Sequence, residues 1–251
     1  MIDGELLAIA QQKIANLHTV DPDRVPVDAV MALWELHSGG SQLGNVESCY
    51  VMSECFGLLG VQTEFVPVAL TIARWRTEEI VACYGKISPT DPRAESWHFL
   101  LRVRKLSALC DPSSPALPEL AGVAGARHVA QFPVGDWDRV GGIVVARGET
   151  MLVYQPVNAA PHDVWQQSAT TIDRLHCANL GSCLAAEVLD ALRWNSQVAR
   201  LDSQRWARVR SMIAAIGDAP LRITDGMHRA FQMPGGEMIT VKDLARSDYT
   251  S

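Results

Sequence analysis

In the first sixty residues, apolar positions recur every three or four residues, which predicts helices. One helix is expected over residues 6–17 and a second over residues 30–37, where a pair of glycines ends it. A third run, Gly44 to Val61, is apolar on a broad face, as is typical of a buried helix. The N-terminal quarter of the chain is therefore predicted to be helical.

From residue 62 the pattern changes to that of β-strands. β-branched and aromatic residues favour a strand over 65–72, in which Pro67 points to a sheet edge or a bulge, and a shorter strand over 79–84. Two more strands, 98–104 and 107–110, are separated by a tight turn. The last two are predicted to form an antiparallel hairpin.

The second half of the chain is predicted to hold another hairpin, three helices and a loose polar tail. In chain order these elements cover residues 141–146, 151–154, 163–175, 178–194, 203–216 and 242–251. Prolines, glycines and alanines collect over 116–130, as at a domain boundary. The pattern as a whole predicts an α+β protein with helices packed on an antiparallel sheet.

Composition narrows the classes of function. The 251 residues are 48% apolar and carry a net charge of −6, and this acidic balance argues against a nucleic-acid partner. Neither a secretion signal nor an apolar run of about 20 residues is present, so we expect a cytoplasmic protein that does not bind membranes. Its six scattered cysteines are then reduced thiols. No pattern points to a cofactor or a metal site.

Three polar residues lie where chemistry could be assembled. Cys49 is near the start of the third helix, His98 begins one hairpin strand and Asp111 ends its partner. The start of one strand and the end of its partner meet at the same edge, so the imidazole and the carboxylate are expected side by side. A helix N-terminus and an imidazolium both lower the pKa of a thiol, and a carboxylate orients the imidazole. Such a trio activates a sulfur nucleophile for acyl transfer.

These residues resemble a known family. A cysteine on a helix, a histidine on a strand and an aspartate opening the next turn are similar to the transglutaminase-like core of the papain-like superfamily, which includes the arylamine N-acetyltransferases. The stretch "LLGVQTEFVPV" is similar to that family's passage from nucleophile helix to first strand, and "WHFLLRV" with "LCDPS" is similar to its histidine and aspartate strands. The resemblance covers about residues 27–115.

The resemblance implies a division into a papain-like core over residues 1–118 and an extension over 119–251 that completes or covers the core. It implies acyl transfer or amide hydrolysis through a thioester on Cys49, with His98 as base and acid and Asp111 as its orienting partner. Gln42 would complete the oxyanion hole. Trp97 and Tyr50, beside the histidine and the cysteine, would line the substrate site.

Two starting points for the third helix lead to different functions. If Ser48 caps the helix, "SCYVMS" resembles the nucleophile segment of papain-type enzymes and Cys49 is exposed for catalysis. If the helix begins at Asn45, Cys49 packs inside and the fold has lost its chemistry. Counting back from Gly60 places the family's nucleophile near Asn45 or Val46, one turn before Cys49.

The expected partners follow from these alternatives. An active protein would take a small-molecule or peptide acyl substrate, and an acyl-carrier protein is a further candidate donor. An inactive one would be a binding or scaffold protein. The C-terminal extension could also form a homodimer. The identity of acyl donor and acceptor is not encoded in the site residues, because one triad serves many substrates.

Overall fold

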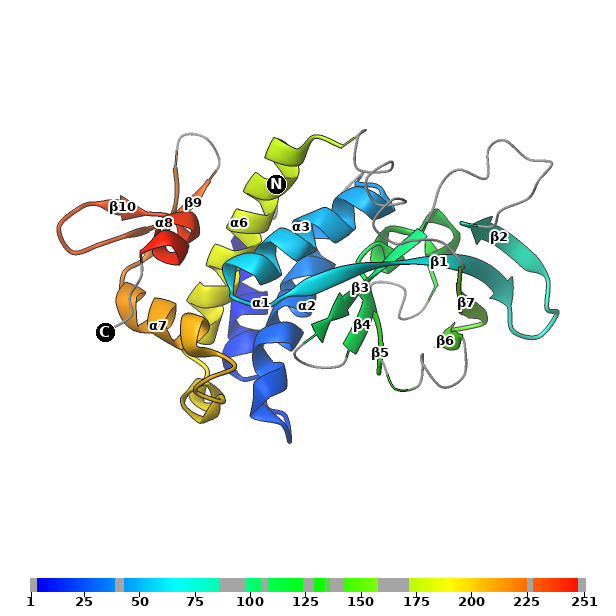
Figure 1. The fold of residues 1–251 in the computed structure, drawn as a ribbon, viewed down its shortest axis with the longest axis horizontal. Helices are drawn as coiled ribbons and strands as arrows, with labels where there is room; N and C mark the ends of the chain where they lie inside the picture. Colours follow the sequence, from blue (N-terminus) through cyan, green and yellow to red (C-terminus); the bar gives the residue numbers. More distant parts are fainter. Residues whose placement is uncertain are drawn as a thin grey trace. The chain divides into compact units, whose positions relative to one another are not determined.

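The computed structural model describes residues 4–38, 43–85, 98–104, 108–123, 129–133, 135, 142–157, 172–224 and 228–247. The chain divides into two compact units that alternate along the sequence (Figure 1). We call the first the helical unit; it comprises residues 1–37, 51–62 and 174–251. The second, the sheet unit, comprises residues 38–50 and 63–173.

The helical unit is arranged around one long buried helix. Its elements are α1 (Gly4–Ala15), η1 (Pro22–Arg24), α2 (Val25–Ser38), the second part of α3 (Asn45–Leu58), α6 (Arg174–Leu192), η5 (Ser196–Arg200), α7 (Ala207–Ile216), β8 (Leu221–Ile223), β9 (Arg229–Gln232), β10 (Met238–Ile239) and α8 (Val241–Arg246). Helix α6 contacts α1, α7, α8 and β9. Because neighbours surround it, apolar and small residues occupy most of its length.

Close packing between α6 and α3 requires a glycine at position 181. A β-carbon built there would lie 2.7 Å from the carbonyl oxygen of Val51 and 2.7 Å from the β-carbon of Glu54.

We therefore expect Gly181→Ala to lower the free energy of unfolding by about 1–3 kcal/mol, as overpacking does. Gly57, on α3, has nothing within 4 Å of its built β-carbon. Gly57→Ala should leave the free energy of unfolding unchanged or raise it by up to about 1 kcal/mol. A urea titration measures both variants, and equal effects of the two changes would contradict close packing at Gly181.

A buried ion cluster joins three elements of the helical unit. Glu187 on α6 is fully buried, and its two carboxylate oxygens lie 2.6 Å from Nε2 of His37 and 2.8 Å from Nε of Arg229. Burial by itself would raise the pKa of Glu187, but the hydrogen bonds and charges of its two partners outweigh burial and lower it. The cluster therefore ties β9 and α2 to the central helix.

The described strands of the sheet unit form one antiparallel sheet. They are β1 (Thr63–Arg74), β2 (Ile80–Tyr84), β3 (His98–Val103), β4 (Ala108–Asp111), β5 (Ala130–Pro133), β6 (Ile143–Arg147) and β7 (Thr150–Pro156). Their order is β5-β4-β3-β1-β7-β6, and β2 also pairs with β1. Short helices η3 (Ser114–Ala116) and η4 (Pro118–Leu120) follow β4.

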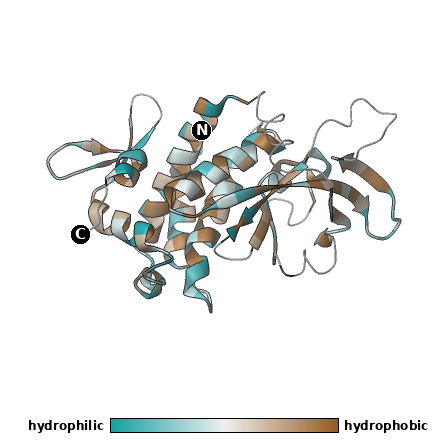
Figure 2. Cartoon of the chain, viewed as in Figure 1, coloured by the Kyte–Doolittle hydropathy of each residue, from teal (hydrophilic) through white to brown (hydrophobic). Residues whose placement is uncertain are grey.

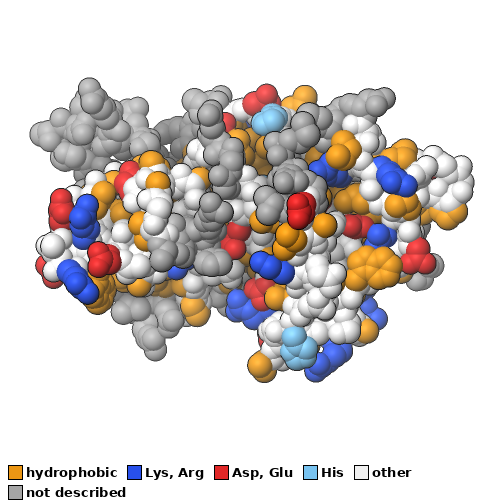
Figure 3. All heavy atoms as spheres, turned by 180° about the vertical axis from the view of Figure 1, so that it is seen from behind, with side chains coloured by type: hydrophobic (Ala, Val, Ile, Leu, Met, Phe, Trp, Pro, Cys, Tyr) orange, Lys and Arg blue, Asp and Glu red, His pale blue; other side chains and the backbone are white. Residues whose placement is uncertain are grey.

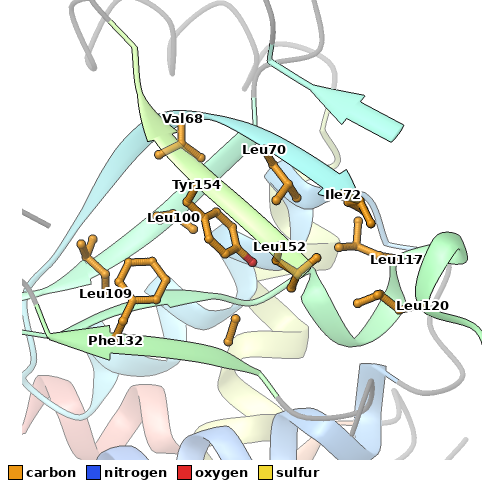
Figure 4. Close-up of a cluster of buried hydrophobic side chains, with 11 residues drawn as sticks. Val68, Leu70, Ile72, Leu100, Leu109, Leu117, Leu120, Phe132, Leu152 and Tyr154 are labelled. Carbon is orange, nitrogen blue, oxygen red and sulfur yellow. The ribbon is translucent and has the colours of Figure 1, made fainter. Parts of the chain in front are cut away.

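Strand β1 organises this sheet because its two halves have different neighbours. Residues 63–68 pair with β3, and residues 68–74 pair with β7. Apolar residues run along β1 (Figure 2). The side chains of Val68, Leu70 and Ile72 belong to a buried apolar cluster (Figure 4). They point toward side chains of the neighbouring strands and of the segment after β4: Leu100, Leu109, Phe132, Leu152, Tyr154, Leu117 and Leu120. Burial of this cluster holds the sheet together.

The α+β class and both predicted hairpins are confirmed: β3 pairs with β4, and β6 pairs with β7. The prediction of a loose tail from residue 242 is wrong over Lys242 to Arg246, which lie in α8. Thr240 and Asp243 form a capping box that starts this helix. The helix expected over 163–175 falls mostly outside the described residues. None of the helices in the described part of the chain is long and apolar enough to cross a membrane.

Charged side chains of both signs are interspersed on the described surface. On the face drawn in Figure 3, Lys and Arg side chains alternate with Asp and Glu side chains and with apolar groups. Several are paired, as in the contact of 3.1 Å between Arg205 and Asp23. Exposed pairs of this kind contribute little to stability.

Candidate functional site

The candidate site lies in the sheet unit, where β3 begins and β4 ends. Nε2 of His98 is 2.8 Å from Oδ2 of Asp111, and both side chains are buried. The two residues meet because β3 and β4 pair antiparallel, with Leu101 opposite Cys110. The predicted juxtaposition of imidazole and carboxylate is present in the structure.

Asp111 is the most heavily hydrogen-bonded group of the site. Its Oδ1 accepts from the backbone N–H of Ser113 at 3.0 Å and from the Ser113 hydroxyl at 2.7 Å, and its Oδ2 accepts from the Tyr154 hydroxyl at 2.8 Å. Burial would raise the pKa of Asp111, but the charge and hydrogen bond of His98, together with the other donors, lower it. The carboxylate is therefore ionised at neutral pH.

Two tyrosine rings flank the imidazole. The ring centroid of His98 lies 6.3 Å from that of Tyr154 and 6.0 Å from that of Tyr84. Burial first, and then the charge of Asp111, raise the pKa of the Tyr154 hydroxyl well above its ordinary value. Tyr84 donates from its hydroxyl to Oε1 of Glu119 at 2.7 Å. Tyr154 therefore remains a neutral hydrogen-bond donor to the carboxylate.

The residue of α3 that reaches the imidazole is Asn45. Its Nδ2 lies 3.4 Å from Nε2 of His98 and donates to the hydroxyl oxygen of Ser113 at 2.9 Å. The same amide also bonds the backbone of Phe99: Oδ1 accepts from its N–H at 2.7 Å and Nδ2 donates to its carbonyl oxygen at 3.0 Å. The side chain of Asn45 therefore fastens the start of α3 to β3.

The pairing of Phe99 explains why a proline fits in β1. Because the N–H and C=O of Phe99 bond to Asn45, the opposite residue on β1, Pro67, occupies a pair without ladder hydrogen bonds. The missing N–H of proline then costs no hydrogen bond on that side. Pro67 also lies in the half of β1 that precedes the β7 ladder, which begins at Val68. The sequence predicts an edge or a bulge at Pro67, and the ladder between β1 and β3 accepts the proline without a shift in register.

Helix α3 begins at Asn45, as in the second of the two alternatives. The Glu47 carboxylate accepts from the backbone N–H of Gly44 at 2.8 Å, and the carbonyl oxygen of Gly44 accepts from the N–H of Ser48 at 2.9 Å. These bonds satisfy the first turn of the helix three residues before Ser48 could cap it. The start of α3 at Asn45 places Cys49 in the second turn of the helix.

Cys49 is enclosed in the protein. Its exposed fraction is 0%, and its Sγ donates to the carbonyl oxygen of Phe99 at 3.4 Å. Burial first, and then the negative charge of Asp111, raise the pKa of the thiol well above its ordinary value. Among the described residues, the hydrogen bond of this sulfur goes to the backbone and not to the ring of His98. The structure brings His98 and Asp111 together without presenting the Cys49 thiol to them.

Of the three other residues predicted for the site, the structure describes Tyr50. Gln42 and Trp97 lie outside the described residues. Tyr50 is half-buried on α3. Within the described residues, no group of three or more His, Cys, Asp or Glu side chains is placed to hold a metal ion.

The sequence gives different amounts of information about three further residues of the site: Asn45, Ser113 and Tyr154. Asn45 is one of the two positions, with Val46, that are reached by counting back from Gly60. Ser113 follows Asp111 in a turn in which an aspartate commonly accepts from the residue two positions on. Tyr154 carried no local signal, because its contact depends on β7 pairing with β1 across about eighty residues. As assembled, the site holds an imidazole whose Nε2 lies next to both the carboxylate of Asp111 and the amide of Asn45.

Comparison with known proteins adds no assignment. No protein-family model, no curated protein and no solved structure matches this chain.

Proposed function

We propose that this chain has a transglutaminase-like, papain-like α+β core that has lost its nucleophile and acts as a binding or scaffold protein. The observation that carries the proposal is Asn45. It lies at the start of α3 beside His98, and it is one of the two positions, Asn45 and Val46, that the family resemblance gives to the reactive cysteine. An amide has no ionisable proton near neutral pH and is not among the side chains that form acyl-enzyme intermediates.

The remaining parts of the site support a structural role for the former triad. His98 and Asp111 keep the hydrogen bond that a catalytic pair would have, at 2.8 Å. Asn45 places its two amide groups on the backbone of Phe99 and on Ser113. The network therefore joins the start of α3 to β3 and to the turn after β4, and it satisfies the buried polar groups of all three.

Acyl transfer through Cys49 is the second candidate, and the His98–Asp111 pair favours it. It requires the thiol to become exposed and to ionise near neutral pH. Both requirements oppose the burial of Cys49 and the raised pKa of its thiol.

Alkylation of the native protein separates the two candidates. We expect iodoacetamide at pH 7 to modify the exposed Cys83 first and Cys49 at least about a hundredfold more slowly, since a local opening of about 3 kcal/mol must precede reaction. Peptide mass spectrometry over time gives both rates. Modification of Cys49 ahead of Cys83 below pH 8 would overturn the proposal and favour acyl transfer.

The family relation is tested separately with Asn45→Cys in a Cys49→Ala background. Position 45 is half-buried, and a thiol there would face the imidazole. We expect this thiol to react with iodoacetamide at pH 6–7 faster than Cys83 in the same sample, and to lose that advantage when His98 is also changed to asparagine. Circular dichroism checks that each variant is folded. If the new thiol in a folded protein reacts no faster than Cys83, position 45 is not the nucleophile position.

A further inference from the structure

A cavity of about 490 Å³ lies in the helical unit, between α1 and the end of α6. Polar side chains line it: Gln11 and Gln12 from α1, Asn16 just after α1, and Asp190 from α6. Trp194, just after α6, completes the wall. The cavity is independent of the site in the sheet unit, and so is the inference drawn from it.

One face of α1 supplies a row of amide and small side chains. Ala8, Gln11, Gln12, Ala15 and Asn16 follow the helical spacing of three and four residues, so they share one face. The two alanines leave room above the helix, and the amides offer both donors and acceptors. The side chain of Gln12 makes no hydrogen bond to the described residues, and Asn16 uses only its Nδ2, which donates to the carbonyl oxygen of Gln12 at 2.9 Å. Unused donors and acceptors therefore face the cavity side of the helix.

Trp194 is exposed and held in place. Its exposed fraction is 60%, which is high for an indole in a folded protein. The guanidinium carbon of Arg193 lies 4.9 Å from the centre of the indole ring. Arg193 is itself fixed, since its Nη1 donates to the carbonyl oxygens of Ala219 at 2.6 Å and Gly217 at 3.2 Å. The indole is thus a supported flat apolar surface at the rim of a polar cavity.

Asp190 adds a fixed acceptor to the same wall. Its Oδ2 accepts from Nε2 of Gln11 at 2.6 Å, and its Oδ1 lies 2.6 Å from Nη2 of Arg193 in an ion pair without hydrogen-bond alignment. Oδ1 is buried, and Oδ2 keeps a lone pair for a further donor. The carboxylate and the guanidinium compensate each other, so the wall has little net charge to attract an ion of either sign.

The chemistry of the wall fits a neutral ligand that has one apolar face and several hydroxyl groups. We propose that this cavity is a saccharide-binding site in which a pyranose ring stacks on Trp194 and its hydroxyls bond to Gln12, Asn16 and Asp190. The axial C–H groups of a pyranose form such an apolar face, and indoles prefer partners that are apolar on one side and polar at the edge. The volume admits one or two sugar rings, as expected for small-ligand cavities.

The test uses the ¹⁵N–¹H indole signals of the full-length protein. The Trp194 signal is assigned from its loss in Trp194→Phe, and the Trp75 signal from Trp75→Phe. Trp75 is a matched control, because its exposed fraction is 62% and it lies in the sheet unit. The probes are methyl β-glucopyranoside, methyl β-galactopyranoside and tri-N-acetylchitotriose, each up to about 50 mM, which covers millimolar dissociation constants. Sorbitol is an open-chain polyol with comparable hydroxyl groups but no rigid ring face, and it serves as the ligand control.

We expect at least one pyranoside to shift the Trp194 signal saturably while the Trp75 signal stays in place and sorbitol has no effect. Gln12→Ala should weaken that binding about fivefold, as loss of one hydrogen bond does. Trp194→Ala removes the reporter signal, so its loss of binding is measured on the pyranoside's own signals by saturation transfer from the protein. The proposal is overturned if no probe shifts the Trp194 signal, if sorbitol shifts it as much as the pyranosides do, or if both tryptophans respond equally.

Discussion

Asp111→Ala is expected to lower the free energy of unfolding by about 3–5 kcal/mol, the usual cost of removing one partner from a buried pair that holds a charge. The change removes one carboxylate and leaves three groups without their acceptor: the ring of His98, the hydroxyl of Tyr154 and the side chain of Ser113. Urea denaturation followed by circular dichroism measures the loss. Glu149→Ala removes an exposed carboxylate of the same unit and should change stability by less than about 0.5 kcal/mol. A loss below about 1 kcal/mol for Asp111→Ala would contradict the network.

Dependence on pH supplies a second measurement of the same carboxylate. The pKa of Asp111 is lowered from its ordinary value of 3.8, so its ionised form stabilises the folded protein fully above that value. The contribution is lost as pH falls from 3.8 through the lower pKa of the folded state. We expect the stability difference between the wild type and Asp111→Asn to shrink in that range. A difference that grows as the pH falls would contradict the sign of the shift.

Glu187→Ala is expected to have a comparable effect in the helical unit, about 3–5 kcal/mol. The change leaves the ring of His37 and the guanidinium of Arg229 without the buried carboxylate that both of them contact. Glu187→Gln keeps the volume and one acceptor, so its loss should be smaller. Hydrogen exchange of the α6 amides measures the opening free energy of this unit apart from the sheet unit. Glu79→Ala is the matched control, because Glu79 pairs with Arg74 at an exposed position. If the α6 amides exchange as slowly in Glu187→Ala as in Glu79→Ala, the cluster does not stabilise the helical unit.

Local sequence was sufficient to predict part of the site. His98 and Asp111 lie on two antiparallel strands that are close in sequence, so their approach follows from strand pairing alone. The start of α3 was also readable in principle. Glu47 is three residues after Gly44, and a glutamate at that spacing commonly accepts from the backbone N–H at the start of a helix. That signal separates the two alternatives for Cys49.

Other features depended on contacts between distant segments. The hydroxyl of Tyr154 reaches Asp111 only because β7 lies beside β1 and β1 lies beside β3. Nothing in the sequence near Tyr154 distinguishes this arrangement from an isolated hairpin. The division into two alternating units has the same origin, since α3 contributes its first residues to one unit and the rest to the other. Helix α8 is not predicted for a different reason. Thr240 and Asp243 have the spacing of a capping box, but the helix that follows has only 6 residues, too few to show a helical pattern.

The two hydrogen bonds between the Asn45 amide and the backbone of Phe99 set the cost of placing a thiol at this position. A cysteine side chain cannot replace both the acceptor and the donor, so the N–H and C=O of Phe99 each lose a partner in Asn45→Cys. A thiol beside the imidazole therefore carries a folding penalty. A second change that supplies a new donor and acceptor at the edge of β3 would be needed to restore the stability of such a variant.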